Sequence, residues 1–293
     1  MYRRAVLFFV LLPFVLSSCR PAGGRRIIIG SKNFTEQIVL AELLSQYIQS
    51  HTDIKVEQRD NLGGTLICQQ AIRSGAIDLY VEYTGTALTE ILKETPSGNS
   101  TDIYNRVNTD YAHRFGLVVT EPLGFNNTFA MVIRGEDARK LKLRTISDIA
   151  PIAPHWRAGF GYEFMERPDG FHGLAETYHL RFAEPPRTME LGLIYRALEE
   201  KLVDIVAGNS TDGVISALDF TVLEDDRHYF PPYDAVPVVR TDTLKKFPEL
   251  RAALRELGGK LSEDEMRRLN YAVDGEHRDV RQVVSEFLRA KKL

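Results

Sequence analysis

The stretch DLYVEYTGTALTE, Asp78–Glu90, contains the change from strand to helix on which the fold prediction depends. Its apolar residues alternate with a period of two as far as Tyr83, which is typical of a β-strand. The alternation stops at Thr84-Gly85-Thr86, where an apolar pattern with helical spacing begins. In open α/β sheets, ligands bind outside the carboxyl ends of the strands. Tyr83 and Thr86 are therefore expected at a position where a ligand can bind.

Strand and helix patterns alternate along the rest of the chain. Predicted strands lie at 25–30, 53–59, 78–83 and 202–207, and predicted helices at 65–74, 86–93, 188–201, 243–257, 262–273 and 276–291. A further helix follows Asn33-Phe-Thr-Glu36, whose first and last residues match a capping box. Repeated β-α units predict an α/β fold with a mostly parallel sheet covered by helices.

Two extended stretches, 126–133 and 234–240, flank a separate α/β region. We interpret them as two crossings of the chain between lobes. One lobe is then expected from 27–124 together with 235–293, and the other from 125–234.

The first 19 residues have the pattern of an export signal. Two arginines precede about twelve apolar residues, which are too few to cross a bilayer as a permanent helix. The run ends in Leu16-Ser-Ser-Cys19, which resembles the lipobox of bacterial lipoproteins and implies lipidation of Cys19. A plain signal peptide with an incidental cysteine is the alternative. Residues 20–26 form a short tether, so the protein is expected in the periplasm or on the outer face of the cell membrane, anchored by lipid.

Composition limits the possible partners and chemistry. The 293 residues are 44% hydrophobic and 26% charged with a net charge of -3, which gives no basic field for nucleic acid. With Cys19 lipidated, Cys68 has no partner for an intramolecular disulfide, and its apolar helical surroundings predict a small core residue.

Motifs of catalysis are missing from the sequence. It contains no Gly-x-Ser-x-Gly elbow, no phosphate-binding Walker loop and no His-Glu-x-x-His, and its seven histidines lack the spacing of metal ligands. We expect a binding protein that is not an enzyme and needs neither a metal nor an organic cofactor. An enzyme acting through carboxylates is the alternative, because such catalysis leaves little trace in one sequence.

The ends of three predicted strands carry polar residues suited to a small ligand. They are Gly30-Ser-Lys-Asn33, Tyr83 to Thr86, and Ala207-Gly-Asn-Ser-Thr-Asp212. Helix N-termini at such breaks favour an anionic group. The face of a tyrosine ring attracts a cation, by roughly 2 kcal/mol when both are desolvated. Together these groups suit a zwitterion.

Several motifs in order along the chain carry a resemblance to a known family. They are Gly30-Ser-Lys-Asn-Phe-Thr-Glu-Gln37, Asn61-Leu-Gly-Gly-Thr65, Asp78 to Thr86, Arg167-Pro-Asp-Gly170, and Leu223-Glu-Asp-Asp226 with Pro231-Pro-Tyr-Asp234. From about residue 27 to 288 the chain resembles the substrate-binding proteins of ABC importers for quaternary amines such as glycine betaine, choline and carnitine. The resemblance implies a type II periplasmic-binding fold, in which two α/β lobes joined by two crossover strands close over the ligand. It also implies a membrane permease as partner, and we expect a monomer.

The resemblance implies roles for eight residues. Lys32, Thr86 and Arg167 would hold a ligand carboxylate, and Tyr83, Phe129 and Tyr195 would form an aromatic cage, with Asn127 and Asn209 beside it. Each residue also has a simpler interpretation: the rings as packing, the cations as solvated charges and the asparagines as turn residues.

Asn209 departs from the family pattern, because a fourth cage aromatic is expected at its position. Losing one wall of a cage costs about 1 to 2 kcal/mol, a factor of roughly 5 to 30 in affinity. The site is then weak for glycine betaine, or suited to a larger betaine such as ergothioneine. A ligand sensor that signals to a receptor is a further alternative to import.

Overall fold

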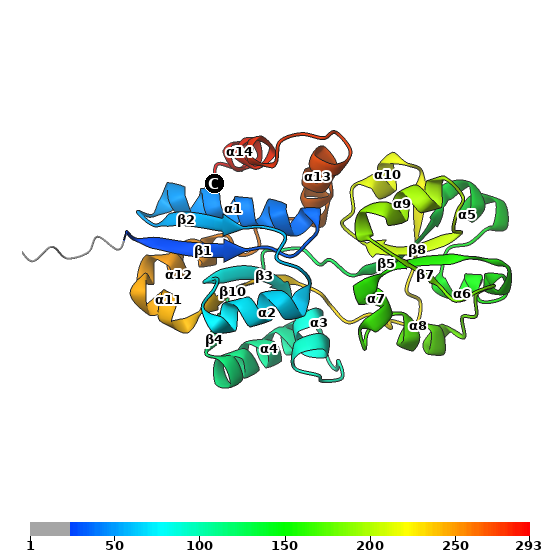
Figure 1. The fold of residues 1–293 in the computed structure, drawn as a ribbon, viewed down its shortest axis with the longest axis horizontal. Coiled ribbons are helices and arrows are strands. Elements are labelled where there is room, and N and C mark those ends of the chain that lie inside the picture. Colours follow the sequence, from blue (N-terminus) through cyan, green and yellow to red (C-terminus); the bar gives the residue numbers. More distant parts are fainter. Residues whose placement is uncertain (1–23) are drawn as a thin grey trace, which may run out of the picture.

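Two five-stranded sheets form two lobes that lie side by side (Figure 1). The structure is a computed structural model that describes residues 24–293. The predicted export signal, Cys19 and most of the tether lie outside the described residues. Within 24–293, no helix has the length and apolar character needed to cross a membrane.

The first lobe is built on a mixed sheet. Its strands, in spatial order, are β2 (Lys55–Arg59), β1 (Arg26–Gly30), β3 (Leu79–Tyr83), β10 (Ala235–Arg240) and β4 (Leu117–Val119). β1 pairs in parallel with β2 and β3, whereas β10 runs antiparallel to β3 and β4. The predicted, mostly parallel arrangement is therefore confirmed: β10 is the antiparallel exception, which enters the sheet after the chain has returned from the second lobe.

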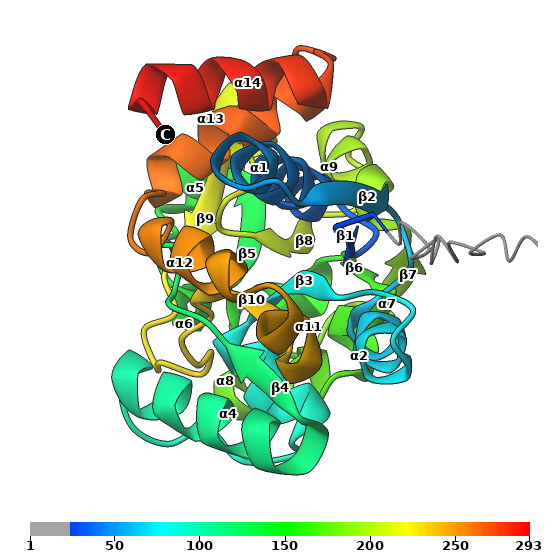
Figure 2. The same cartoon turned by 90° about the vertical axis from the view of Figure 1, so that its left-hand side faces the viewer.

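Helices cover both faces of this sheet (Figures 1 and 2). The core on one face contains residues of α1 (Thr35–His51), α11 (Thr241–Lys246), α12 (Pro248–Glu256), α13 (Glu263–Asp274) and α14 (Val280–Lys291). The core on the other contains residues of α2 (Thr65–Ser74), the π-helical turn Ala87–Ile91 that follows α3 (Thr84–Thr86), and α4 (Ser100–Phe115). Tyr83 belongs to the first core and Tyr80 to the second, as their odd spacing along β3 requires. Cys68 is buried in the second core, and burial raises the pKa of its thiol to about 12.

The second lobe has the same plan with different lengths. Its strands are β7 (Arg187–Met189), β6 (Ala158–Gly161), β8 (Ile205–Asn209), β5 (Phe129–Arg134) and β9 (Phe220–Leu223). β6 is parallel to β7 and β8, and β5 is antiparallel to β8 and β9. Its helices are α5 (Gly135–Leu141), α6 (Ile146–Ile149), the 3-10 turn Ala153–His155, α7 (Tyr162–Glu166), α8 (Phe171–Tyr178), α9 (Leu191–Glu199) and α10 (Val214–Ala217).

The chain passes between the sheets twice, from β4 to β5 and from β9 to β10. The two passages meet at an antiparallel bridge between Asn126 and Asp234. Beside them, Phe129 and Phe230 pack against the hydrophobic cores of both lobes. The two passages are therefore paired with each other, and the aromatic rings beside them contact the cores of both lobes.

Four predicted elements differ from the structure. The helix predicted at 243–257 is two helices, because Pro248 starts a new one and holds Phe247 outside the helical region. Residues 188–189 of the helix predicted at 188–201 belong to β7, and the last helix begins only at Val280. The capping box predicted at 33–36 is wrong. Phe34 is the N-cap residue, no side chain caps the helix, and Glu36 is bonded elsewhere.

Candidate functional site

A cavity of about 50 Å³ lies between the lobes, at the carboxyl ends of β1, β3 and β8. Seven of the eight predicted ligand residues line it: Lys32, Tyr83, Thr86, Asn127, Phe129, Arg167 and Asn209. Phe34, Glu163, Phe164, Leu191, Ala207, Gly208 and Tyr233 complete the lining. Because pockets for drug-sized ligands occupy about 300 to 1,000 Å³, the walls of this cavity must move apart to admit most ligands.

Five aromatic rings line the cavity, of which the sequence predicted two. Phe129 is at the centre, with ring centroids 4.8 Å from Phe164 and 6.0 Å from Tyr233. Tyr83 stacks against Phe34 at 6.4 Å. Phe34 and Tyr233 occur inside two motifs that carried the family resemblance, but nothing in the sequence marked their rings as part of the wall.

The structure does not bring Tyr195 to the cavity wall. Its ring stacks on Phe220, and its hydroxyl donates a hydrogen bond to Asp212 at 2.6 Å. Asn209 does line the cavity, and its backbone N–H donates to the same carboxylate at 2.8 Å. Burial raises the pKa of Asp212 to about 6. Tyr195, predicted as a cage residue, therefore binds Asp212 and does not line the cavity.

Lys32 reaches the cavity as half of a buried ion pair. The lysine is 2% exposed and its Nζ lies 2.5 Å from Glu82 Oε1 and 2.9 Å from Thr65 Oγ1. The same ammonium lies 5.2 Å from the centroid of the Tyr83 ring. The charge that was predicted to hold a ligand carboxylate thus already has a carboxylate partner.

Arg167 also belongs to a buried ion pair. Its guanidinium donates two hydrogen bonds to Asp169, at 2.8 and 2.5 Å, and one to Thr86 Oγ1 at 3.0 Å. Its centre also lies 4.9 Å from the centroid of the Phe129 ring. Burial alone would lower the pKa of Arg167, but the hydrogen bonds and charge of Asp169 outweigh it and raise that pKa.

Carboxylates outnumber cations around the cavity. Glu163 lines it and accepts a hydrogen bond from the backbone N–H of Thr65 at 2.9 Å. With the partners of Lys32 and Arg167, three carboxylates face two cationic side chains. This balance favours a cationic group in the cavity, and a ligand carboxylate would have to share a cation with the protein. Elsewhere in residues 24–293, no group of three or more His, Cys, Asp or Glu is arranged to hold a metal ion.

Comparison with known proteins agrees with this geometry. Residues 25–290 match the family described as the substrate-binding domain of ABC-type glycine betaine transport systems. The chain belongs to this family. It is 35% identical to the carnitine transport binding protein OpuCC of Listeria monocytogenes, over 97% of this chain and 95% of the relative. The ergothioneine transport permease/ergothioneine binding protein EgtU of Helicobacter pylori is 34% identical over 89% of this chain and 47% of the relative.

The fold of the family is confirmed by a solved structure. A crystal structure titled glycine betaine/carnitine/choline ABC transporter superposes with a TM-score of 0.76 at 34% identity, covering 90% of this chain and 98% of that one. The type II periplasmic-binding fold and the family suggested by the sequence motifs are both confirmed. The chain is thus a solute-binding protein of the ABC betaine-importer class.

Hydrogen bonds cross between the lobes of this substrate-binding protein. Besides the Arg167–Thr86 and Glu163–Thr65 bonds, Thr89 Oγ1 donates to Asp169 Oδ2 at 2.8 Å. Such bonds require the two lobes to be in contact. The structure therefore represents a closed arrangement of the binding protein.

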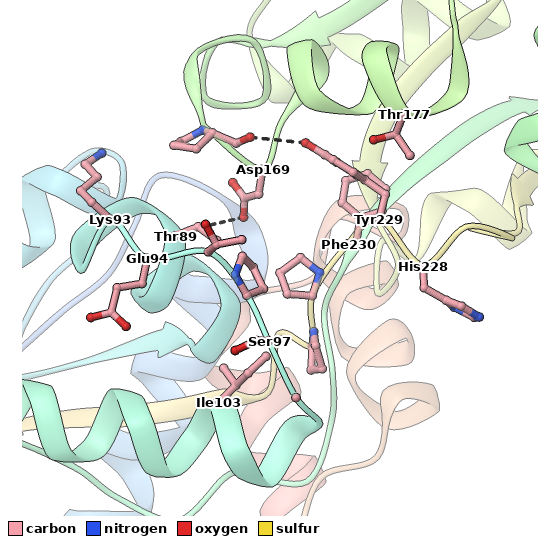
Figure 3. A pocket seen from close by; sticks show the side chains of 16 residues that line it. Thr89, Lys93, Glu94, Ser97, Ile103, Asp169, Thr177, His228, Tyr229 and Phe230 are labelled. Carbon is pink, nitrogen blue, oxygen red and sulfur yellow. Dashed lines mark hydrogen bonds between the residues drawn. The ribbon is translucent and has the colours of Figure 1, made fainter.

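A second, larger cavity of about 820 Å³ lies beside the Thr89–Asp169 bond (Figure 3). Its aromatic residues are Tyr229 and Phe230, and the Tyr229 hydroxyl donates to the backbone carbonyl of Gly170 at 3.0 Å. This larger cavity has fewer aromatic rings and none of the predicted ligand residues, so the smaller cavity matches the predicted site better.

Proposed function

We propose that the protein captures a quaternary ammonium compound, such as glycine betaine, choline or a similar betaine, and delivers it to an ABC permease for osmoprotectant uptake. One observation carries this proposal: five aromatic rings and an excess of carboxylates converge on one cavity between the lobes. A methylated ammonium has no N–H to donate, so ring faces and nearby negative charge are the groups that recognise it.

Binding is coupled to closure of the lobes. Lys32, Tyr83 and Thr86 come from the first lobe, and Arg167 and Asn209 from the second, so a ligand between them touches both only when the lobes meet. A ligand that gains contacts in the closed state shifts the population toward it. The closed form then docks on the permease. No step in this cycle requires covalent chemistry, a metal or an organic cofactor.

The location of the protein follows from the sequence of its first residues. Export and acylation of Cys19 would hold the two lobes at the outer face of the membrane, next to the permease. A lipid anchor removes the need for a membrane-spanning helix.

A larger betaine is the second candidate. Asn209 replaces a ring by an amide that can hydrogen-bond an extra polar group of the ligand, and the relative EgtU is named for ergothioneine. A sensor that binds the same ligands without import is compatible with the same site.

Isothermal titration of residues 20–293 with glycine betaine, choline, carnitine and ergothioneine tests the proposal. We expect micromolar or tighter binding of at least one of them. Heat from ergothioneine but not from glycine betaine would favour the second candidate. If no quaternary amine bound, the proposed function would be wrong.

A further inference from the structure

Glu36 is a buried carboxylate that lies one layer behind the cavity wall. It is 2% exposed and is not among the residues that line the cavity. Its Oε1 accepts hydrogen bonds from the Tyr83 hydroxyl at 2.6 Å and Asn127 Nδ2 at 2.8 Å. Its Oε2 accepts from Thr211 Oγ1 at 2.5 Å and Asn270 Nδ2 at 3.0 Å. One carboxylate thus holds two wall residues.

The bond to Glu36 determines which end of the Asn127 amide is free. A carboxylate only accepts hydrogen bonds, so the amide nitrogen of Asn127 must face it. The carbonyl Oδ1 is then left over, and among the described residues it has no hydrogen-bond partner although it is buried. Asn127 lines the cavity, whereas the other residues with an unpaired buried amide oxygen, Gln37, Asn126 and Asn270, do not. Because buried acceptors are nearly always paired, a donor on the ligand would satisfy this one.

The Tyr83 hydroxyl cannot accept the hydrogen bond from the ligand in place of the Asn127 carbonyl. Its hydroxyl donates its proton to Glu36 and accepts a hydrogen bond from Gln37 Nε2 at 3.0 Å. Burial and the neighbouring Glu36 raise the pKa of the Tyr83 phenol, so the hydroxyl keeps its proton. Tyr83 is held so that its ring, rather than its hydroxyl, is available to the ligand.

The same carboxylate also joins the two lobes. Thr211 follows β8 in the second lobe, whereas Glu36 is in α1 of the first. The set of hydrogen bonds to Glu36 is therefore complete only when the lobes are in contact.

We propose that Glu36 is a positioning residue that holds the Asn127 side chain with its carbonyl oxygen free for the ligand. This inference rests on the proposed function. The site then selects a quaternary amine that also carries a hydrogen-bond donor, a hydroxyl or a ring N–H, near its cationic group. Glycine betaine has no such donor, whereas hydroxylated betaines and imidazole-containing betaines do.

A matched pair of ligands tests the selectivity. L-carnitine and γ-butyrobetaine differ by one hydroxyl group and share the trimethylammonium and carboxylate. We expect isothermal titration of residues 20–293 to show carnitine binding at least tenfold more tightly, because its analogue leaves the Asn127 carbonyl unpaired. Equal affinities would overturn the inference.

Glu36→Leu tests the positioning role. A leucine accepts no hydrogen bond from Asn127 Nδ2, so the Asn127 amide is no longer held with its carbonyl free for the ligand. The carnitine preference should fall to about threefold or less. Thr211→Val is the matched control, since it removes the bond between the lobes and should weaken both ligands equally. An unchanged preference in Glu36→Leu would contradict the role.

Asn127→Leu provides a test that does not depend on the folding of the Glu36→Leu variant. It removes the amide and should bring the two ligands to similar affinity, whereas a retained tenfold preference would overturn the inference. The outcomes separate this inference from the proposed function. Equal, measurable binding of both ligands to the native protein preserves the function and rejects the selectivity, while failure of every quaternary amine to bind rejects both.

Discussion

Thr89 of the first lobe donates a hydrogen bond across the boundary between the lobes to Asp169 of the second, at 2.8 Å (Figure 3). The same carboxylate accepts two hydrogen bonds from Arg167 and one from the Tyr233 hydroxyl at 2.6 Å. Asp169 therefore links the cation at the cavity wall to both lobes and to the second crossover. Contact between the lobes and the position of Arg167 are coupled through this one side chain.

Thr89→Val should weaken ligand binding by about 2- to 10-fold, the range that corresponds to a net hydrogen bond of about 0.5 to 1.5 kcal/mol. The bond to Asp169 forms only when the lobes meet, so its loss destabilises the closed state relative to the open one. Isothermal titration with the best ligand measures the change. Thr109→Val, on the exposed face of α4, is the control and should leave the affinity as it is. Equal affinities in all three proteins would show that the bond does not contribute to closure.

Arg167→Met should lower the free energy of unfolding by about 3 to 5 kcal/mol, because it leaves a buried carboxylate without its cation. The side chains of Arg167 and Asp169 are only 6% and 5% exposed. Adding Asp169→Asn to the first substitution should restore part of the loss, since no charge is then left unpaired. Urea unfolding of the two single variants and the double variant measures this. A double variant destabilised by the sum of the single effects would argue against a coupled pair.

Much of the fold was predictable because it depends on local patterns. The period-two run ending at Tyr83, the helix at 65–74 and the repeated β-α units each follow from spacing within a few residues. The antiparallel entry of β10 was not predictable in this way, because its direction depends on the chain having crossed to the other lobe and returned. The break at Phe247 has a local signal in Pro248, although the apolar pattern with helical spacing continues across it.

The residues that line the cavity were predicted better than the buried side chains that hold them in place. Motifs place Lys32 and Arg167 at the site, and Asp169, the partner of Arg167, lies in the same motif. The partner of Lys32 comes from a position that no spacing rule connects to it. Glu82 follows Lys32 by 50 residues and meets it only because β1 and β3 are neighbours. Glu36 fitted a local capping motif in the sequence, and its contacts with Thr211 and Asn270 depend on the packing of the lobes.

The contribution of Asp212 to stability should fall as the pH rises from about 4 to 6. Burial raises the pKa of Asp212 to about 6 from an ordinary value of 3.8. Between these values the folded protein holds a proton that the unfolded chain has lost, so the free energy of unfolding decreases with rising pH. Below 3.8 both states are protonated, and above 6 the full penalty is present, on the order of 3 kcal/mol. The pKa of Glu36 is also raised by burial, which adds an effect of the same sign.

Asp212→Asn removes this titration while retaining an oxygen that can accept from Tyr195 and from the Asn209 backbone. Urea unfolding between pH 4 and 7 should show that the free energy of unfolding of the variant, relative to that of the native protein, increases as the pH rises. Parallel profiles would show that Asp212 does not titrate in this range.

Asn209→Tyr should tighten glycine betaine binding by roughly 5- to 30-fold, which corresponds to a gain of about 1 to 2 kcal/mol from one further ring face. Asn209 is at the end of β8 and lines the cavity, so a ring at this position can join those of Phe129 and Tyr83. The same ring occupies space in a cavity of about 50 Å³, so larger betaines should bind more weakly. Asn209→Leu is the control, because it adds apolar volume without an electron-rich face. If leucine improved glycine betaine binding as much as tyrosine did, the gain would come from filling space, and a cage completed at position 209 would not explain the specificity.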